Sequence, residues 1–490
     1  MNLASVVEQH DPDSVALVAG VEIVTYGDLR ERVDVARAAL SRAGVGVGDA
    51  VAVMAPNAPD TVVALLAVLG VGAVFAPLNP QSPAAEVRRE LSLVSAVAAI
   101  GAFPADPDVP IVPVQGGAEP AAGRGSVVDL DPSAPALAMF TSGTAGAPRA
   151  ALLSHGNLLA NIEQTEAVDD LRRRPDDVTL GLLPLFHVFG VNVVLLPTLR
   201  AGGRVVLVDD FDPQGTADLV AAHRVTLLTG PPTMWSALVG APDSVEPAAF
   251  GSVRLAASGA AALPVSVARA VRERFGLVVH EGYGLTEASP VVATSAGTGA
   301  PAGSIGRPLP GVEVRLLDAH GDDVLVGDVG HLHVRGPNVF VGYEDDPEAT
   351  AAVLTDDGWL RTGDLAVVDD DGHLFLVDRA KDLVIVSGFN VFPAEVEEVL
   401  ASHPTVADVA VHGRPHERTG EMVVADVVAS AEAPADDTAW FAALDAHVGS
   451  HLSRYKCPGE YHRVTTIPRG LGGKVQRRLL PDVEEGAGGV

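Results

Sequence analysis

The chain has 490 residues, of which 48% are hydrophobic and only 4% are aromatic, so its length allows two to four folding units with largely aliphatic cores. Sixty-three acidic against thirty-three basic side chains give a formal net charge of −30, which argues against sequence-independent binding of nucleic acid or of anionic lipid. Any anionic ligand must therefore be met locally, by backbone N–H groups, a helix N-terminus, a divalent cation or a well-placed basic side chain.

The first part of the chain gives indications about compartment and membrane. The opening MNLASVVEQHDPDS lacks the basic segment of a secretory signal, and the single Cys457 excludes an internal disulfide and fits a reducing cytosol. Residues 61–78 carry no charge, but glycines and a proline interrupt their second half. This pattern predicts a buried helix over 59–69 followed by a buried strand, and not a membrane span. We expect a cytoplasmic protein, whose oligomeric state the sequence does not indicate.

Short runs rich in valine and leucine alternate with helical patterns along the first 300 residues. Examples are VAVMAPN, VVLVDD and TLLTGPP, at 51–57, 205–210 and 226–232. Apolar strands that alternate with helices predict largely parallel sheets covered on both faces. The predicted class is therefore α/β.

A different pattern begins after Gly303. VEVRLLD (312–318) and HLHVRG (331–336) alternate apolar and polar residues, which predicts half-exposed antiparallel strands. Residues 367–388 then predict a strand, a DG turn, a second strand, a charged bridge and a third strand.

The charged bridge is the predicted domain boundary, because few contacts are expected to cross it. Residues 1–378 would form an N-terminal domain and 379–382 a hinge. Residues 383–490 would form a small C-terminal domain with its own strands and helices, such as 393–402.

The stretch TSGTAGAPRA, residues 141–150, is rich in hydroxyls and glycines and contains one charge, Arg149. It is not a Walker phosphate loop, since the fifth residue after Gly143 is Pro148 and not the required glycine. Its glycines let several N–H groups converge on an anion, and its hydroxyls add donors without charge. From these residues alone, a phosphate-binding loop and an ordinary surface loop both remain open.

Further motifs decide between these interpretations. Together with the 141–150 loop they resemble the adenylate-forming superfamily of acyl- and aryl-CoA synthetases, non-ribosomal adenylation domains and luciferases. The resemblance covers nearly the whole chain and is greatest to bacterial fatty-acyl-CoA synthetases. The motifs are PLFHVFG (184–190), SGAAALP (258–264), GYGLTEASP (282–290), GSIGRPLPG (303–311), VRGPNVFVGY (334–343), GWLRTGDLA (358–366), DRAKDLVIVSGFNVFPAEVE (378–397) and PRGLGGKVQRRLL (468–480).

The resemblance implies a fold and a reaction. The fold would be a large N-terminal domain with a small antiparallel barrel-like subdomain, followed by a small mobile α+β cap. The reaction would be the ATP-dependent conversion of a carboxylic acid, a medium- or long-chain fatty acid, to acyl-AMP and then to acyl-CoA. ATP, Mg²⁺ and CoA would take part, and AMP and pyrophosphate would be released.

The resemblance also implies which residues bind the nucleotide. The 141–146 loop would surround the phosphates, Thr144 and Glu287 would hold Mg²⁺, and Tyr283 would stack on adenine. Asp364, helped by Arg379, would accept hydrogen bonds from the ribose. The full set is Thr141, Ser142, Gly143, Thr144, Ala145, Gly146, Gly259, Ala260, Ala261, Tyr283, Gly284, Thr286, Asp364 and Arg379.

Two of the three lysines in the chain acquire roles through the resemblance. Lys474 would bring its ammonium group to the acid and the α-phosphate, and Lys381 would be the hinge. The GFN loop, with Gly388 and Phe389, would bind CoA.

Two side chains would serve the acyl group. His187 would lie between the acyl and thiol channels, although a packing or capping histidine is the alternative. Trp235 would gate the acyl tunnel, and an ordinary core tryptophan is the alternative.

The sequence departs from the family pattern at several positions, namely Ala145, Arg149, Ala150 and His331. Loss of one hydroxyl at position 145 would weaken ATP binding by ~1 kcal/mol, whereas Arg149 keeps a positive charge. Two other functions remain open: a ligase that loads a carrier protein in trans, and a non-catalytic homologue that binds nucleotide or acyl groups.

Overall fold

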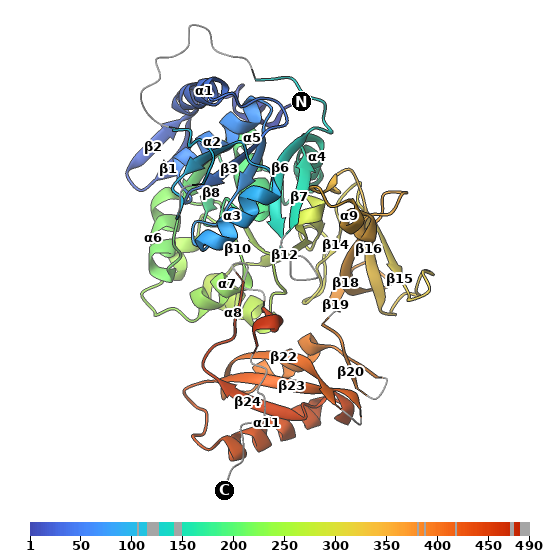
Figure 1. Cartoon of the computed structure of the whole chain (residues 1–490). Helices are drawn as coiled ribbons and strands as arrows, with labels where there is room; N and C mark the ends of the chain where they lie inside the picture. The colour runs from blue at the N-terminus through green and yellow to red at the C-terminus, as the bar shows by residue number, and fades with distance from the viewer. Residues whose placement is uncertain are drawn as a thin grey trace. The chain divides into compact units, whose positions relative to one another are not determined.

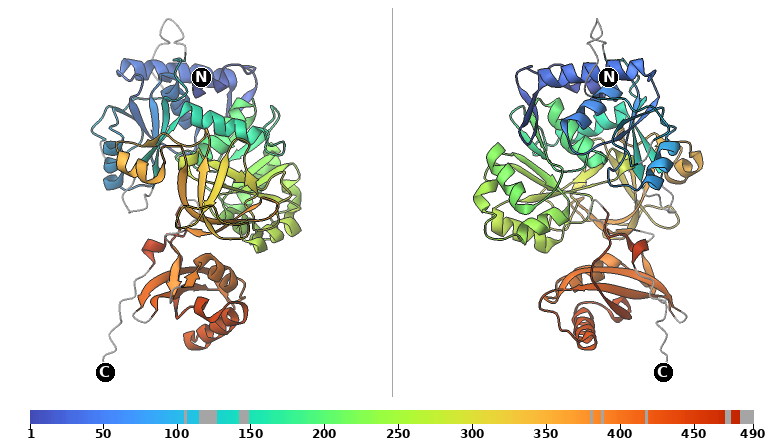
Figure 2. Two further views of the ribbon diagram at one scale, coloured as in Figure 1. Left: turned by 90° about the vertical axis from the view of Figure 1, so that its right-hand side faces the viewer. Right: turned by 60° about the vertical axis from the view of Figure 1, so that its left-hand side comes forward.

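The structure, a computed structural model, describes residues 1–104, 107–114, 127–141, 149–379, 382–386, 389–416, 419–470 and 475–480. They form two compact units, which Figures 1 and 2 show as ribbons. Unit 1 consists of Met1–Val314 and His333–Arg361, and unit 2 of Arg315–Leu332 and the part from Thr362 onward. The predicted hinge, residues 379–382, begins at the last residue of β19 (Leu374–Arg379), with residues 380–381 outside the described ranges, and remains a prediction.

Unit 1 is built on two sheets, and each has parallel strands at its centre, as the apolar runs predict. In order across the first sheet, the described strands are β14 (Arg307–Pro308), β13 (Val291–Thr294), β12 (Val279–Gly284), β11 (Leu255–Ser258), β10 (Leu227–Gly230), β8 (Val178–Gly181), β9 (Arg204–Leu207), β1 (Val15–Ala19) and β2 (Glu22–Thr25). Those of the second are β17 (Gly342–Tyr343), β7 (Arg149–Ser154), β6 (Pro135–Thr141), β4 (Val74–Pro77), β3 (Ala50–Met54) and β5 (Ala98–Gly101).

Helices cover these sheets (Figure 1). They are α1 (Tyr26–Arg42), α2 (Pro59–Gly70), α3 (Ala84–Leu93), α4 (His155–Glu166), α5 (Leu196–Arg200), α6 (Pro213–His223), α7 (Pro232–Val239), α8 (Val265–Phe275) and α9 (Pro347–Val353), with a π-helical turn, η2 (Gly190–Leu195), before α5. Local signals place several of their ends: a Thr25–Asp28 capping box opens α1, and Gly276, at φ 72°, ends α8.

The uncharged segment of the sequence is confirmed as a buried helix followed by a buried strand. Every residue of α2 except Asp60 is buried, and β4 is buried throughout. The helix packs on α1 and reaches β1 of one sheet and β3 and β4 of the other, which explains why it is apolar on all sides. No helix among the described residues is long and apolar enough to cross a membrane.

One face of the first sheet packs on α6, α7 and α8 and forms a large core. Trp235 and Phe250 are almost fully buried there, and Ala256 of β11 contributes to the same cluster. The other face of β10 to β13 is therefore the one left for a binding pocket.

The chain region after Gly303 contains the predicted strands with alternating burial. A four-stranded sheet has the order β15 (Glu313–Leu317), β16 (Gly330–Arg335), β18 (Leu360–Val368) and β19 (Leu374–Arg379). β18 and β19 pair antiparallel, and in β16 buried and half-buried residues alternate.

The rest of unit 2 is a sheet with two helices. Its strands are β21 (Phe389–Val391), β20 (Val384–Val386), β23 (Gly420–Ala429), β22 (Val406–His416) and β24 (Glu460–Val464). The helices α10 (Pro393–Ala401) and α11 (Asp437–His451) bury Val396, Leu400, Trp440 and Leu444 against it. The α/β class predicted from the sequence is confirmed.

Candidate active site

The candidate site lies over one face of the first sheet of unit 1. Residues that pair across neighbouring strands point to the same face, and successive residues of a strand alternate between faces. The registers Thr229↔Ala257, Ala257↔His280 and Gly282↔Thr294 therefore align one row of residues across β10 to β13. All five line the same pocket.

Small residues make this face a channel. Ala257 carries only a methyl group, and a Cβ built on Gly282 would meet only the carbonyl oxygens of Ser258 and Ala293, at 3.8 and 3.9 Å. The other walls of the channel come from residues that flank the sheet: Thr165, Leu171, Arg173, Val188, Phe189 and Val193. The result is a mainly apolar passage with a few polar groups.

His187 lines this pocket, as the sequence predicts for a residue beside the acyl group. Its side chain is open to solvent within the pocket but is surrounded by protein atoms, and this desolvation lowers its pKa. The Nδ1 atom accepts a hydrogen bond from the N–H of Phe189 at 3.1 Å, so the neutral ring carries its proton on Nε2. His187 is therefore an uncharged donor near neutral pH.

The pocket continues past the carboxyl ends of β11 and β12, where ligands of open α/β sheets bind. Here it is lined by residues that the sequence predicts for the nucleotide: Gly259, Ala260, Tyr283, Gly284 and Thr286. Together with His187, these are the predicted residues that the structure brings into one pocket.

Bare backbone is required at this end. A Cβ on Gly284 would lie 2.1 Å from the carbonyl oxygen of Pro290, and Ala260 has a φ of 71°. The Oγ of Ser258, which also lines the pocket, is buried without a hydrogen-bond partner among the described residues. An unpaired buried hydroxyl is the kind of group that a ligand completes.

Glu287, the predicted magnesium ligand, is held by Tyr343. The Tyr343 hydroxyl donates to Oε1 of Glu287 at 2.7 Å, and the N–H of Phe340 donates to the Glu287 carbonyl at 2.8 Å. The Arg149 guanidinium lies 5.5 Å from the centre of the Tyr343 ring, and its Nε is 3.0 Å from Asp346 Oδ2. Burial and the nearby Glu287 charge both raise the pKa of Tyr343, so its hydroxyl remains a donor.

These contacts fit a magnesium site in their chemistry. Mg²⁺ takes hard oxygen ligands, usually one or two carboxylates, and the groups that orient such ligands matter nearly as much as the ligands themselves. Glu287 is a carboxylate oriented by a protonated phenol. The second predicted ligand, Thr144, lies outside the described residues.

Three charged or titratable side chains of the pocket were not predicted from the sequence: Arg173, His280 and Glu281. Burial lowers the pKa of His280, although the charge of Asp170 opposes this. Burial raises the pKa of Glu281 to about 7, although the Leu263 N–H donates to its Oε2 at 3.2 Å. Two adjacent ionisable residues in a half-buried strand, directly before the GYG motif, were the signal available for His280 and Glu281.

Trp235 is placed differently from a channel-lining residue. It is fully buried in the core behind the sheet, does not line the pocket, and donates its indole N–H to the Ala257 carbonyl at 3.3 Å. This is the position of a core tryptophan that supports the channel floor. A gating role for Trp235 remains a prediction.

Other predicted site residues belong to unit 2. Asp364 lies on β18, is 5% exposed and pairs in register with Arg379 of β19. Phe389 is 56% exposed, and its ring centre is 4.9 Å from that of Tyr455. Their roles towards nucleotide and CoA remain predictions.

The remaining predicted residues cannot be placed in the pocket. Thr141 is the last residue of β6, and Ala261 follows Gly259 and Ala260 without lining the pocket itself. Outside the described residues lie Ser142, Gly143, Thr144, Ala145, Gly146, Lys381, Gly388 and Lys474, together with the side chain of Arg379.

Comparison with known families supports the whole-chain resemblance. Residues 4–344 match the profile of the AMP-binding enzyme family, and residues 395–474 match that of the AMP-binding enzyme C-terminal domain.

Among curated relatives, the long-chain-fatty-acid–CoA ligase of Yersinia pestis is 36% identical over 357 residues, which are 71% of this chain and 61% of the ligase. The match thus spans less than two thirds of the length of that relative. The sulfoacetate–CoA ligase of Cupriavidus necator is also 36% identical, over 71% of this chain and 67% of its own.

Solved structures are similar over almost the whole chain. ATP-bound MatB from Rhodopseudomonas palustris has a TM-score of 0.90 at 31% identity and covers 98% of both chains. The o-succinylbenzoate CoA synthetase of Bacillus subtilis, in complex with its acyl-adenylate, has a TM-score of 0.87 at 27% identity and covers 99% of both.

Proposed function

We propose that this chain, which belongs to the AMP-binding enzyme family, is an AMP-forming acyl-CoA synthetase. It would join a carboxylic acid to AMP with release of pyrophosphate, and then transfer the acyl group to the thiol of CoA. The observation that carries this proposal is the single pocket that connects the channel over the sheet with the bare-backbone end beside Gly259 and Tyr283. An acid extended along the channel presents its carboxylate at the strand ends, where the nucleotide would bind.

The acid would be an aliphatic one of medium or long chain. Leu171, Val188, Phe189, Val193 and Leu255 supply an apolar lining, which favours a hydrocarbon chain. Relatives named for long-chain fatty acids and for sulfoacetate are equally similar to this chain. The walls of its own channel must therefore decide the substrate.

Both steps bring anions together, so the residues mainly have to compensate charge. Glu287 and Thr144 would hold Mg²⁺, which when bound neutralises phosphate oxygens. The hydroxyls and N–H groups of the 141–146 loop would bind the phosphates without adding charge. His187 would donate from Nε2 while remaining neutral, and Lys474 would place one positive charge between the acid and the α-phosphate.

The two half-reactions would use two poses of the C-terminal domain. Rotation at Lys381 would deliver Lys474 for adenylation and then the loop with Gly388 and Phe389 for thioester formation. The single cysteine, Cys457, is buried, which supports a location in the reducing cytoplasm.

A panel of carboxylic acids scored for pyrophosphate release tests this function, with CoA or a pantetheinylated carrier protein as the acceptor. We expect acid-dependent release and transfer to CoA. Failure of every acid to stimulate release would refute the proposal, and transfer to the carrier alone would favour the carrier-loading alternative.

The two-pose scheme has its own test in the Lys474→Ala variant. It should abolish adenylation but leave thioester formation from supplied acyl-AMP largely intact, because the ammonium group acts only in the first step. Equal loss of both half-reactions would contradict the scheme.

A further inference from the structure

Arg173 is an unusual residue for the wall of an apolar channel. Its Nη1 donates to the Leu171 carbonyl at 2.5 Å and its Nη2 to the Val193 carbonyl at 2.8 Å, and both partners are uncharged. Its Nε is buried and has no hydrogen-bond partner among the described residues. The guanidinium of this pocket-lining residue therefore keeps one donor that no described residue uses.

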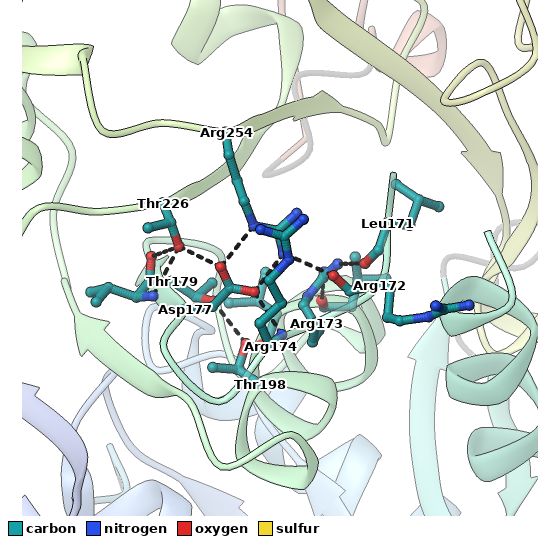
Figure 3. A network of polar contacts seen from close by, with 12 residues as sticks. Leu171, Arg172, Arg173, Arg174, Asp177, Thr179, Thr198, Thr226 and Arg254 are labelled. Atoms are coloured by element: carbon teal, nitrogen blue, oxygen red, sulfur yellow. Dashed lines mark hydrogen bonds and ion pairs between the residues drawn. The ribbon is translucent and has the colours of Figure 1, made fainter. Parts of the chain in front are cut away.

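The carboxylates that influence Arg173 are bound to other arginines. Asp177 accepts hydrogen bonds from Arg254, with 2.8 Å between Arg254 Nε and Oδ1, and Figure 3 shows this contact beside the 171–174 segment. Glu166 accepts a hydrogen bond from Arg200 at 2.6 Å. Within the described ranges, no carboxylate forms an ion pair with Arg173.

The positive charge on this wall persists at neutral pH. Burial, and then the like charge of Arg254, lower the pKa of Arg173 to about 10, which still leaves the group protonated. A buried cation without a paired anion is costly, and a ligand that supplies the anion would remove that cost.

Arg173 lies at the end of the channel remote from the nucleotide. Arg254, the residue before β11, donates from Nη2 to the Arg172 carbonyl at 2.8 Å, which ties this segment to the beginning of β11, and Leu255, the first residue of that strand, lines the same pocket. Gly259, at the nucleotide end, is four residues further on, or about 13 Å at the rise of a strand. The strand between these two ends of the channel is therefore about as long as an extended acyl chain.

The neighbours of Arg173 leave this charge available. His280 faces the same channel and is neutral near pH 7, because burial lowers its pKa. Glu281 follows it on β12 and also lines the pocket, but its Oε2 accepts a hydrogen bond from the Leu263 N–H at 3.2 Å, and no ion pair joins it to Arg173 among the described residues. Its carboxylate is thus not placed to pair with Arg173.

We propose that Arg173 recognises a second carboxylate at the far end of the substrate, so that the preferred acids are aliphatic dicarboxylates. This inference rests on the proposed acyl-CoA synthetase function and refines its substrate class. A guanidinium binds a carboxylate through parallel N–H donors, whereas a terminal methyl group would leave the cation desolvated and unpaired.

The test compares acids of equal length in the wild-type protein: adipate with hexanoate, suberate with octanoate, and sebacate with decanoate. In at least one pair, kcat/KM for pyrophosphate release should be about 10-fold or more higher for the dicarboxylate, the scale of one charge-assisted hydrogen bond. If the ratio of kcat/KM for the dicarboxylate to that for the monocarboxylate is near one or below in all pairs, and the monocarboxylates are activated, this inference is overturned and the proposed function stands. No release with any acid would overturn both.

Two variants locate the effect. Arg173→Met should bring the ratio close to one, mainly by raising KM for the dicarboxylate. Arg172→Met is the matched control, since Arg172 is 57% exposed and pairs with Asp169 on the surface, and it should keep the wild-type ratio. An unchanged ratio in Arg173→Met would overturn the assignment. If Arg173→Met does not fold, Arg173→Lys and the wild-type ratios decide, because lysine keeps the charge but loses the paired donors.

Discussion

Replacing Tyr343 by phenylalanine isolates one hydrogen bond of the candidate site. The substitution removes the hydroxyl that donates to Glu287 Oε1 at 2.7 Å. It keeps the ring, whose centre is 5.0 Å from that of Phe340 and 5.5 Å from the Arg149 guanidinium carbon. The packing around Glu287 is thus preserved while its carboxylate loses one fixed orientation.

The expected effect can be bounded in two ways. A hydrogen bond to a charged group contributes about 1.5–3 kcal/mol, and loss of a group that orients a metal ligand costs about 10- to 100-fold in metal affinity or activity. Both bounds indicate a loss of about 10- to 100-fold in kcat/KM for ATP. The loss should be smaller at high Mg²⁺, if the hydroxyl acts by orienting a magnesium ligand.

Pyrophosphate release measured over a range of Mg²⁺ concentrations checks this. The Tyr343→Phe variant should need more Mg²⁺ to reach half of its maximal rate, and its KM for the acid should stay within about twofold of the wild-type value. An unchanged Mg²⁺ dependence, or an equal loss at all concentrations, would show that Tyr343 does not act through a magnesium ligand at Glu287.

Three further substitutions test other parts of unit 1. Gly282→Leu should fill the channel beside Gly259 and lower kcat/KM for short and long acids alike by at least ~10-fold, which a chain-length profile would show; an unchanged profile would contradict the channel. Glu281 has a pKa raised to about 7 by burial, so wild-type stability should fall as pH rises from about 4.5 to about 7. Glu281→Gln should therefore raise the unfolding free energy at pH 8 by up to ~3 kcal/mol and leave it unchanged near pH 4.5. Urea denaturation at a series of pH values tests this, and an equal difference between variant and wild type at every pH would refute it. For Asp177, burial alone would raise the pKa, but hydrogen bonds from Arg254, Thr226 and the Arg174 N–H outweigh it and lower the pKa. The stabilisation by the Asp177 carboxylate is present above the unfolded pKa of about 3.9 and lost below it. Asp177→Asn should therefore lower the unfolding free energy by about 3–5 kcal/mol at pH 7 and by progressively less below pH 4. An equal loss at pH 7 and below pH 4 would contradict the ion pair.

The sequence predicts the sheets of unit 1 well because their strands are buried on both faces. Runs such as VAVMAPN and TLLTGPP are apolar throughout, and they form β3 and β10 with parallel neighbours. The sequence also distinguishes α2 from a membrane span, since a glycine follows the helix and β4 begins a few residues later. Here local composition and tertiary burial point to the same structure.

The candidate site divides into a part that the sequence predicts and a part that it does not. Gly259, Tyr283 and Thr286 belong to quoted motifs, because close approach of a ligand to the backbone demands specific residues. Arg173 belongs to no motif, and its importance depends on which arginine Asp177 binds. That choice is made by residues distant in the chain, so no local pattern could report it.

The chain carries thirty excess negative charges, yet the groups of the candidate pocket contribute little negative charge. Glu281, near Tyr283 on the same strand, is only partly ionised at pH 7 because burial raises its pKa to about 7. Desolvation thus removes negative charge near the position where ATP would bind, without requiring basic residues there. A strongly acidic protein can in this way keep an anion site whose positive charges are few and placed only where the substrate must be oriented.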